Sequence, residues 1–217
     1  MAGTITAIEP QQRSITPRRG GGGQRFNVFV DGRYALSLDA SLAVQLRLEQ
    51  ELDDATLASL VQADEQRRAL DAAYTLLSYR PRSAREITTR LQQKGYSPEA
   101  IAATRARLDA FGLVDDAAFA RYWVEQRQTF RPRGAAALRH ELRAKGVGAP
   151  DIAAALPPAE GENDAAYRAA LPRARSLARL DRPTFRRRLG AYLQRRGFSY
   201  AASAAAVDRL WSEVTDE

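Results

Sequence analysis

The chain has 217 residues, a formal net charge of +7, no cysteine and one histidine. This length supports one or two domains with an apolar core, while the lack of cysteine excludes a disulfide framework and a thiolate metal site. A single histidine excludes the common multi-histidine zinc patterns, so we expect no metal and no cofactor. No apolar run approaches the roughly 18 residues of a membrane-spanning helix, and the start MAGTITAIEPQQ is unlike a signal peptide. We expect a cytoplasmic protein that does not bind membranes.

The positive charge is unevenly distributed. Residues 1–64 carry 6 arginines against 8 acidic residues, whereas residues 65–217 carry 27 basic against 18 acidic residues. Within 173–198 there are nine arginines and a single acid, Asp181. Such an excess of basic residues in one part of the chain is typical of proteins that bind nucleic acid or an acidic protein surface. An arginine-rich genome would raise the charge everywhere, and the acidic first segment argues against that alternative.

The first 40 residues contain segments whose composition and alternation are typical of β-strands. TITAI (4–8), RFNVFV (25–30) and RYALSL (33–38) read as strands, and Asp31-Gly32 between the last two favours a type I′ hairpin turn. The intervening PQQRSITPRRGGGGQ predicts a loop, and its glycine run is not a P-loop because no Lys-Ser/Thr follows. These features predict a small three-stranded antiparallel unit.

Helical patterns begin after Asp39. Leu42, Leu46 and Leu48 suggest a short helix, and Asp53-Asp54 can cap the next one. From there to Val214 the chain reads as helical, with breaks at glycine and proline.

An internal repeat with a period of 51 residues organises this helical part. Tyr79 matches Phe130 at this spacing, and Ile101 matches Ile152. The positions shared by all three copies are Arg80-Pro81, Arg131-Pro132 and Arg182-Pro183; Leu91, Leu142 and Leu193; Gly95, Gly146 and Gly197; and Tyr96, Val147 and Phe198. Because these matches need no gap, they indicate a true repeat.

Each copy predicts three helices. The predicted helices are 65–79, 83–94 and 98–111; 115–129, 134–145 and 150–156; and 164–180, 184–196 and 199–214. Pro172 should kink or split the seventh, and PPAEGEND (157–164) is the best candidate hinge. Because helices this short bury too little apolar surface alone, neighbouring triplets must share a core.

The fold prediction is therefore mainly α. We expect three tandem three-helix repeats in an elongated stack, preceded by the β unit. The predicted segments are 1–64 for the β unit with short helices, and 65–114, 115–162 and 163–217 for the repeats.

The recurring hexamer LQQKGY (91–96), LRAKGV (142–147) and LQRRGF (193–198) predicts a helix end. With Lys94 as the last helical residue, Gly95 takes a positive φ, and Tyr96 contacts Leu91 in a Schellman cap. The basic residue also meets the negative end of the helix dipole. Ser83 with Glu86 has capping-box spacing, and Ser97-Pro98-Glu99 is a helix start. Lys94 and its equivalents still point outward, where they could contact a partner.

The sequence shows no combination of residues typical of a catalytic site. His140 in RHEL is better explained as a solvated helix position than as a base, and the pairs Asp53-Asp54 and Asp115-Asp116 are explained by capping. We therefore expect no catalytic residues, no metal site and no enzyme.

Basic side chains are the candidate binding residues. In a regular stack, equivalent connections between helices lie on one side, which would give a basic stripe suited to phosphates or carboxylates. The alternative for any single arginine is a solvated charged face. The candidates are Arg80, Arg82, Lys94, Arg131, Arg133, Lys145, Arg182, Arg186, Arg187, Arg188, Arg195 and Arg196.

Two stretches carry a family resemblance. RPRSAREITTRLQQKGYSPEAI and LVDDAAFARYWVEQRQTFRPRGAAALRHELRAKGV, including the run Gly112 to Ala120, resemble the RecX family, regulators of the RecA recombinase. The resemblance covers about residues 65–214 and is most specific in the middle copy. It departs in the third copy, where lysines are largely replaced by arginines, Pro172 is present, and Phe185 stands at the position of Ser83.

The resemblance implies a right-handed or crescent stack of three-helix repeats that binds in the groove of the RecA–DNA filament. We expect single- or double-stranded DNA within or near the filament as a second partner. The resemblance also implies inhibition of the ATPase and strand exchange of RecA, and hence limits on recombination and the SOS response. Two alternatives stay open: a sequence-specific helix-turn-helix-like DNA-binding regulator, and a helical-repeat scaffold with no role for nucleic acid. Since no dimerisation helix is evident, we expect a monomer.

Overall fold

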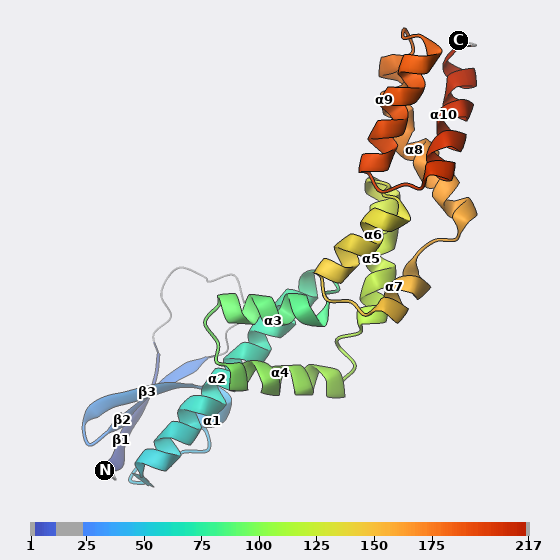
Figure 1. Ribbon diagram of the computed structural model, residues 1–217. Coiled ribbons are helices and arrows are strands. Elements are labelled where there is room, and N and C mark those ends of the chain that lie inside the picture. The colour runs from blue at the N-terminus through green and yellow to red at the C-terminus, as the bar shows by residue number, and fades with distance from the viewer. Residues whose placement is uncertain (1–2, 12–23, 216–217) are drawn as a thin grey trace. The chain divides into compact units, whose positions relative to one another are not determined.

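The computed structural model describes residues 3–11 and 24–215. Most of the predicted loop PQQRSITPRRGGGGQ, with its glycine run, lies outside the described residues. The chain divides into two compact units, Met1–Val114 and Asp115–Glu217, which we call the first and second unit and describe separately (Figure 1).

The first unit begins with an antiparallel sheet of order β3-β2-β1-β4. Its strands are β1 (Gly3–Pro10), β2 (Arg25–Val30), β3 (Arg33–Asp39) and β4 (Glu51–Leu52). The type I′ turn is confirmed, since Asp31 and Gly32 have φ of 49° and 75°. The three predicted strands are confirmed, and the sheet has in addition the two-residue β4, which pairs with β1 and was not predicted. So short a strand shows no alternating pattern in the sequence.

The short helix predicted after Asp39 is only partly correct. The helix α1 (Ala40–Ala43) begins at the N-cap Asp39, whose side chain accepts a hydrogen bond from the backbone of Ser41. It ends before Leu46, which packs against the sheet core from a turn instead, and Leu48 is exposed.

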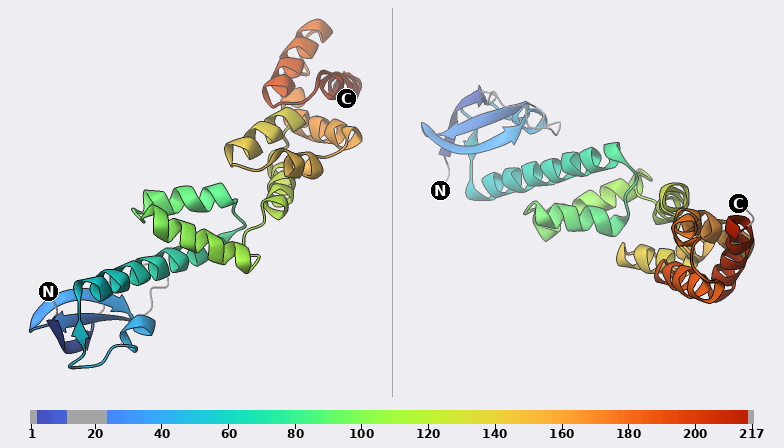
Figure 2. Two further views of the ribbon diagram at one scale, coloured as in Figure 1. Left: turned by 60° about the horizontal axis from the view of Figure 1, so that its bottom comes forward. Right: turned by 90° about the horizontal axis from the view of Figure 1, so that it is seen from above.

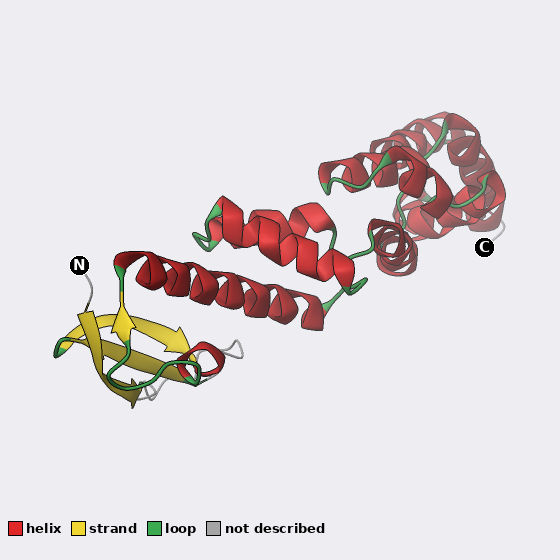
Figure 3. Cartoon of the chain, turned by 90° about the horizontal axis from the view of Figure 1, so that it is seen from below, coloured by secondary structure: helices red, strands yellow, loops and turns green. Residues whose placement is uncertain are grey.

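One long helix, α2 (Asp54–Tyr79), contributes residues to two apolar cores, that of the sheet and that of the first helix triplet. Its N-cap is Asp53, as the capping preference predicts, so the helix starts at Asp54, eleven residues before the predicted 65–79. Its first half packs Leu57 and Leu60 on the sheet, and its second half packs Leu70 and Ala73 with α3 (Ala84–Gln93) and α4 (Pro98–Ala110). Figures 2 and 3 show the sheet at one end of α2 and the two shorter helices along the other.

A buried carboxylate holds α2 to the sheet. Asp64 is only 5% exposed and accepts two hydrogen bonds, of 3.1 and 2.9 Å, from the guanidinium of Arg25 on β2. It also accepts the backbone N–H of Asp39 at 2.9 Å. Because a buried charge without partners is strongly destabilising, this network fixes the position of α2 on the sheet.

The second unit contains two helix triplets. The first consists of α5 (Asp116–Phe130), α6 (Ala135–Ala144) and α7 (Ala149–Ala155), close to the predicted ranges. The second consists of α8 (Ala159–Leu177), α9 (Arg182–Arg195) and α10 (Tyr200–Thr215). With the first unit, this gives ten helices in the described part of the chain, as expected for a mainly α fold with three triplets.

Three details of the third copy differ from the predictions. The prediction of a hinge at PPAEGEND (157–164) is wrong over most of that segment, because α8 begins at Ala159. Pro172 does not split α8, which continues through it to Leu177. The helix α9 starts at Arg182 because Asp181 caps it, accepting a hydrogen bond of 2.9 Å from Thr184 N. Phe185, at the position of Ser83, is thereby placed inside the helix, where it is fully buried.

The hexamer is confirmed as a helix end in all three copies. Gly95, Gly146 and Gly197 have φ of 83°, 82° and 82°. In the first copy, Tyr96 N donates to Leu91 O at 3.3 Å and Gly95 N donates to Gln92 O at 2.9 Å. These are the two hydrogen bonds of a Schellman cap, and the other copies repeat them.

The third of these helix ends also joins the two triplets of the second unit. Gly134 N donates to Arg196 O at 3.1 Å, and Ala136 N donates to Gly197 O at 3.2 Å. The backbones approach so closely that a Cβ at Gly134 would overlap the carbonyl group of Gly197. The start of α6 therefore rests directly on the end of α9, with no side chain between them.

This contact gives a stability prediction. Gly134 has φ of −73°, which alanine adopts without strain, so Gly134→Ala should destabilise the second unit through overlap alone, by about 1–3 kcal/mol. Gly148→Ala is the matched control, because Gly148 is also a helix N-cap with φ of −67° but its nearest neighbour would lie at 3.7 Å. Unfolding by denaturant, followed by the fluorescence of Trp123 and Trp211, measures both. Equal losses in the two variants would contradict the account of the contact.

Candidate nucleic-acid and filament interface

Two adjoining hollows in the second unit are lined by arginines. The first, of about 420 Å³, lies beside α9 and is lined by Arg173, Arg187, Arg188, Ala191, Tyr192 and Arg195. The second, of about 390 Å³, is lined by Arg131, Arg133, Tyr192, Arg195 and Arg196. Because they share Tyr192 and Arg195, we treat them as one surface, the basic groove. In the part of the chain that the structure describes, neither hollow is lined by Asp or Glu.

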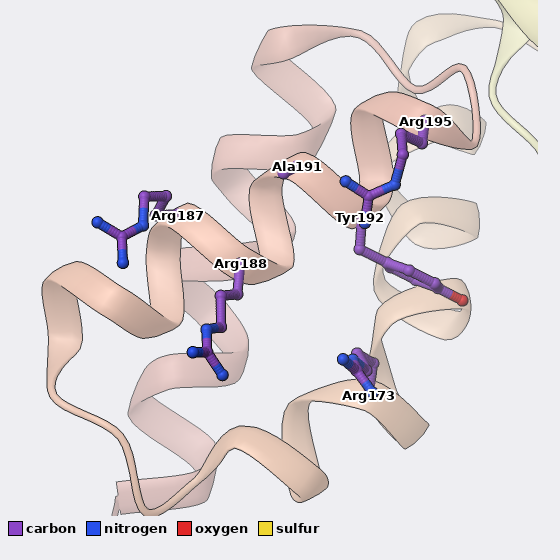
Figure 4. A pocket seen from close by; sticks show the side chains of 6 residues that line it. All are labelled: Arg173, Arg187, Arg188, Ala191, Tyr192 and Arg195. Carbon is purple, nitrogen blue, oxygen red and sulfur yellow. The ribbon is translucent and has the colours of Figure 1, made fainter.

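The helical period of α9 explains why its arginines reach the groove. Phe185, Leu189 and Leu193 follow one another at intervals of four residues and are fully buried against α8 and α10. The arginines between them must therefore face outward. Figure 4 shows Arg188 and Tyr192 extending from α9 toward α8, from which Arg173 extends toward them.

The contact between α6 and α9 brings a second group of arginines to the same surface. Arg131 and Arg133 lie in the connection that precedes α6, and Arg196 is the C-cap of α9. The guanidinium of Arg196 lies 5.4 Å from the ring centroid of Tyr192 and donates a hydrogen bond to its hydroxyl group. The Tyr192 hydroxyl group in turn donates to Ala169 O at 3.2 Å. These contacts hold the tyrosine in place in the middle of the groove.

A glutamate and a tryptophan support this side of the groove. Glu141 Oε2 accepts hydrogen bonds of 2.8 Å from both Trp123 Nε1 and Arg127 Nε, while Arg133 Nε lies 3.7 Å from the other oxygen. Lys145 Nζ lies 4.1 Å from the centroid of the Trp123 ring. This cation–π geometry occupies Lys145 within its own triplet, and Lys145 does not line the groove.

The equivalent residues of the first unit are used differently. Arg80 forms a two-pronged ion pair with Glu86, at 3.0 and 3.2 Å, and Arg82 Nε donates to Leu76 O at 2.9 Å. Burial lowers the pKa of Arg82, because the guanidinium loses hydration, and the adjacent charge of Arg80 lowers it further. These two arginines stabilise their own connection, whereas Lys94 is exposed.

The remaining candidates lie on α9. Arg182 is the first residue of that helix, not part of a connection as predicted, because Asp181 starts the helix early. Arg186 Nε lies 3.8 Å from Asp208 Oδ1 of α10, outside both hollows. Of the twelve predicted basic residues, six line the groove: Arg131, Arg133, Arg187, Arg188, Arg195 and Arg196.

The described residues contain neither a group of metal-ligating side chains nor a membrane-spanning helix. Among them, no three His, Asp or Glu side chains are grouped so as to hold a metal ion, and His140 is exposed, as expected. None of the helices described is long and apolar enough to cross a membrane.

Comparisons with known proteins identify the repeats. Family models for the first, second and third three-helix domains of RecX match residues 69–108, 115–156 and 160–207. The regulatory protein RecX of Bacillus subtilis is 33% identical over 219 residues, covering 98% of this chain and 79% of that protein. The chain belongs to the RecX family.

Solved structures agree with this assignment. A crystal structure of a regulatory protein RecX has a TM-score of 0.68 at 27% identity, covering 99% of this chain and 100% of its own. RecX from Lactobacillus salivarius has a TM-score of 0.61 at 20% identity, covering 68% of this chain and 97% of its own, and supports the fold alone.

Two groove residues with polar side chains, Arg173 and Tyr192, are not among the predicted candidates for this RecX family member. Arg173 follows Pro172 on α8, the first helix of its triplet, whereas the candidates were chosen from the second helix and the connection before it. Tyr192 was missed because only charge was considered. Its place between Arg188 and Arg196, one helical turn from each, is a signal that could have suggested it.

The support beneath the groove can be tested with Glu141→Gln. The amide keeps one acceptor but loses the charge that holds Arg127 and Arg133, so the second unit should lose about 1–2 kcal/mol of unfolding free energy. Glu125→Gln, an exposed glutamate on α5, should change it by less than about 0.5 kcal/mol. Denaturant titration followed by tryptophan fluorescence compares them. A Glu141 variant as stable as the control would show that the cluster contributes nothing.

Proposed function

We propose that this protein binds the RecA–DNA filament and restrains its ATPase, its growth and its strand exchange. The observation that carries the proposal is the basic groove, in a chain that belongs to a family of regulatory proteins. Seven arginines surround one tyrosine there. Guanidinium groups form paired, charge-assisted hydrogen bonds with phosphates and carboxylates, and both are abundant on a nucleoprotein filament.

The arrangement of the groove favours contact with an extended partner. Its arginines come from α8, α9 and the connection before α6, so a partner that fills it must touch both triplets of the second unit. Arg131 in one hollow and Arg187 in the other are exposed, which suits a chain of charges better than an enclosed small molecule. The proposal implies a cytoplasmic monomer in which the segments 65–114, 115–162 and 163–217 each present one triplet.

The alternative is a regulator that reads a DNA sequence, because three-helix units resemble helix-turn-helix modules. Arginine binds phosphates irrespective of sequence and also reads the edge of guanine in the major groove, so the two functions differ in how binding depends on sequence. Competition between specific and random duplexes over a range of salt decides between them. Weak binding that is steeply salt-dependent and indifferent to sequence would remove the alternative.

The test of the proposal is the DNA-dependent ATPase of preformed RecA filaments at stoichiometric amounts of this protein. We expect inhibition by the native chain. The variant Arg187→Ala/Arg188→Ala/Arg195→Ala should need at least about tenfold more protein for half-inhibition, since a tenfold change corresponds to ~1.4 kcal/mol and each charged hydrogen bond contributes about that much.

The matched control is Arg85→Ala/Arg139→Ala/Arg143→Ala, which removes three exposed arginines outside the groove. It changes the net charge by the same amount and should inhibit like the native chain. If the native chain leaves the ATPase and strand exchange unchanged, the proposed function is wrong. If both triple variants weaken inhibition equally, total charge and not the groove is responsible.

A further inference from the structure

An exposed aromatic residue lies next to the basic groove. Phe130 is the last residue of α5 and is 74% exposed. It directly precedes Arg131, which lines the groove together with Arg133. A phenyl ring gains nothing from contact with water, and the apolar cores of the second unit do not include it. The fold therefore gives no reason for an aromatic side chain at this position.

Tyr79 is the residue of the first copy that is equivalent to Phe130, and the arginines that follow it do not line the basic groove. Tyr79 ends α2, is 71% exposed and is followed by Arg-Pro-Arg, as Phe130 is. The arginines that follow Tyr79 are held by Glu86 and by the Leu76 carbonyl group. The arginines that follow Phe130 both line a hollow, and Arg133 lies 3.7 Å from Glu141 as well. Both copies therefore have an ion pair at this motif, but only the arginines that follow Phe130 also line the basic groove.

An exposed aromatic side chain that directly precedes groove arginines in the chain suits one class of ligand in particular. In single-stranded nucleic acid the bases are unpaired and can stack on an aromatic ring, while the phosphates follow a positively charged groove. In a duplex the faces of the bases are covered by their neighbours and only their edges are accessible. An acidic peptide would be attracted by the arginines but would not require the aromatic ring.

We propose that Phe130 stacks on an unpaired base of a single strand whose phosphates occupy the basic groove. This inference rests on the proposed function, since it states which form of nucleic acid the groove takes. Phe130 then selects single strands over duplexes, and the arginines supply attraction that does not depend on sequence. The groove runs on from Arg131 and Arg133 through Tyr192 to Arg187 and Arg188 on α9, so adjacent phosphates have several guanidinium partners.

Fluorescence anisotropy with labelled oligothymidylate, in the absence of RecA, tests this inference on the full chain. Phe130→Ala should weaken binding about tenfold, within the range of one base–aromatic stack. Phe130→Trp should bind at least as well as the native chain. Phe130→Leu keeps an apolar side chain without a π face and should behave like Phe130→Ala. Because the side chain is exposed, these variants should fold, and their far-UV circular dichroism checks it.

Tyr79→Ala is the matched control and should leave oligothymidylate binding unchanged. A labelled duplex of the same length should bind the native chain and Phe130→Ala equally well. The inference is overturned if Phe130→Leu binds like the native chain, or if Phe130→Ala loses single-strand and duplex binding to the same extent. It is also overturned if Phe130→Ala binds oligothymidylate normally and fails only on RecA filaments, because the ring then contacts protein.

These outcomes separate the inference from the proposed function. A native chain that leaves the RecA ATPase unchanged, yet requires Phe130 for oligothymidylate, would refute the filament proposal and keep the stacking residue. Normal filament inhibition by Phe130→Ala, with unchanged oligothymidylate binding, would keep the filament proposal and refute the stacking residue.

Discussion

The backbone contact between Gly134 and Gly197 is the constraint on which the second unit depends. The first N–H groups of a helix and its last carbonyl groups lack partners within that helix. Here the start of α6 and the end of α9 satisfy one another, through Ala136 N and Gly197 O at 3.2 Å. Glu162 of α8 accepts the next free donor, Ala135 N, at 2.9 Å. The triplet α8–α10 therefore caps α6 of the triplet α5–α7. The helix α6 has no capping side chain at its own N-terminus.

This contact also creates the basic groove. It places the connection before α6, with Arg131 and Arg133, against the end of α9, with Arg195 and Arg196. Neither triplet has the full set of arginines alone. The like charges repel one another in the free protein, so an anionic ligand would relieve repulsion as well as form hydrogen bonds. A structural cap and a binding surface thus share the same residues at the end of α9.

Much of this could be predicted from local sequence chemistry. The helix ends at Gly95, Gly146 and Gly197, the N-caps Asp53, Ser83 and Ser97, and the Asp31-Gly32 turn each follow from a few neighbouring residues, and all are confirmed. The two-residue β4 was missed because its pairing is long-range. The predicted start of α9 at residue 184 is two residues late, because Asp181 caps the helix and places Arg182 at its first position.

The candidate site was harder to predict, because the repeat implies that equivalent residues have equivalent roles. Arg80 and Arg82 form internal bonds, Arg131 and Arg133 line the groove, and Arg182 begins a helix. Lys145 stacks on Trp123, a partner that the first copy lacks, since Ala72 stands at the matching position. Which arginines are available for binding is decided by tertiary partners, and a single sequence does not contain that information.

The central claim is that phosphates bind in the groove, and the salt dependence of binding to preformed RecA–DNA filaments tests it most directly. Each arginine that neutralises a phosphate contributes roughly 0.7 to 0.9 to the slope of log affinity against log salt. We predict that the slope becomes shallower by about 2 when Arg187, Arg188 and Arg195 are replaced together by alanine. An unchanged slope with that variant would contradict the account, because it would place the contacts with phosphates elsewhere on the protein.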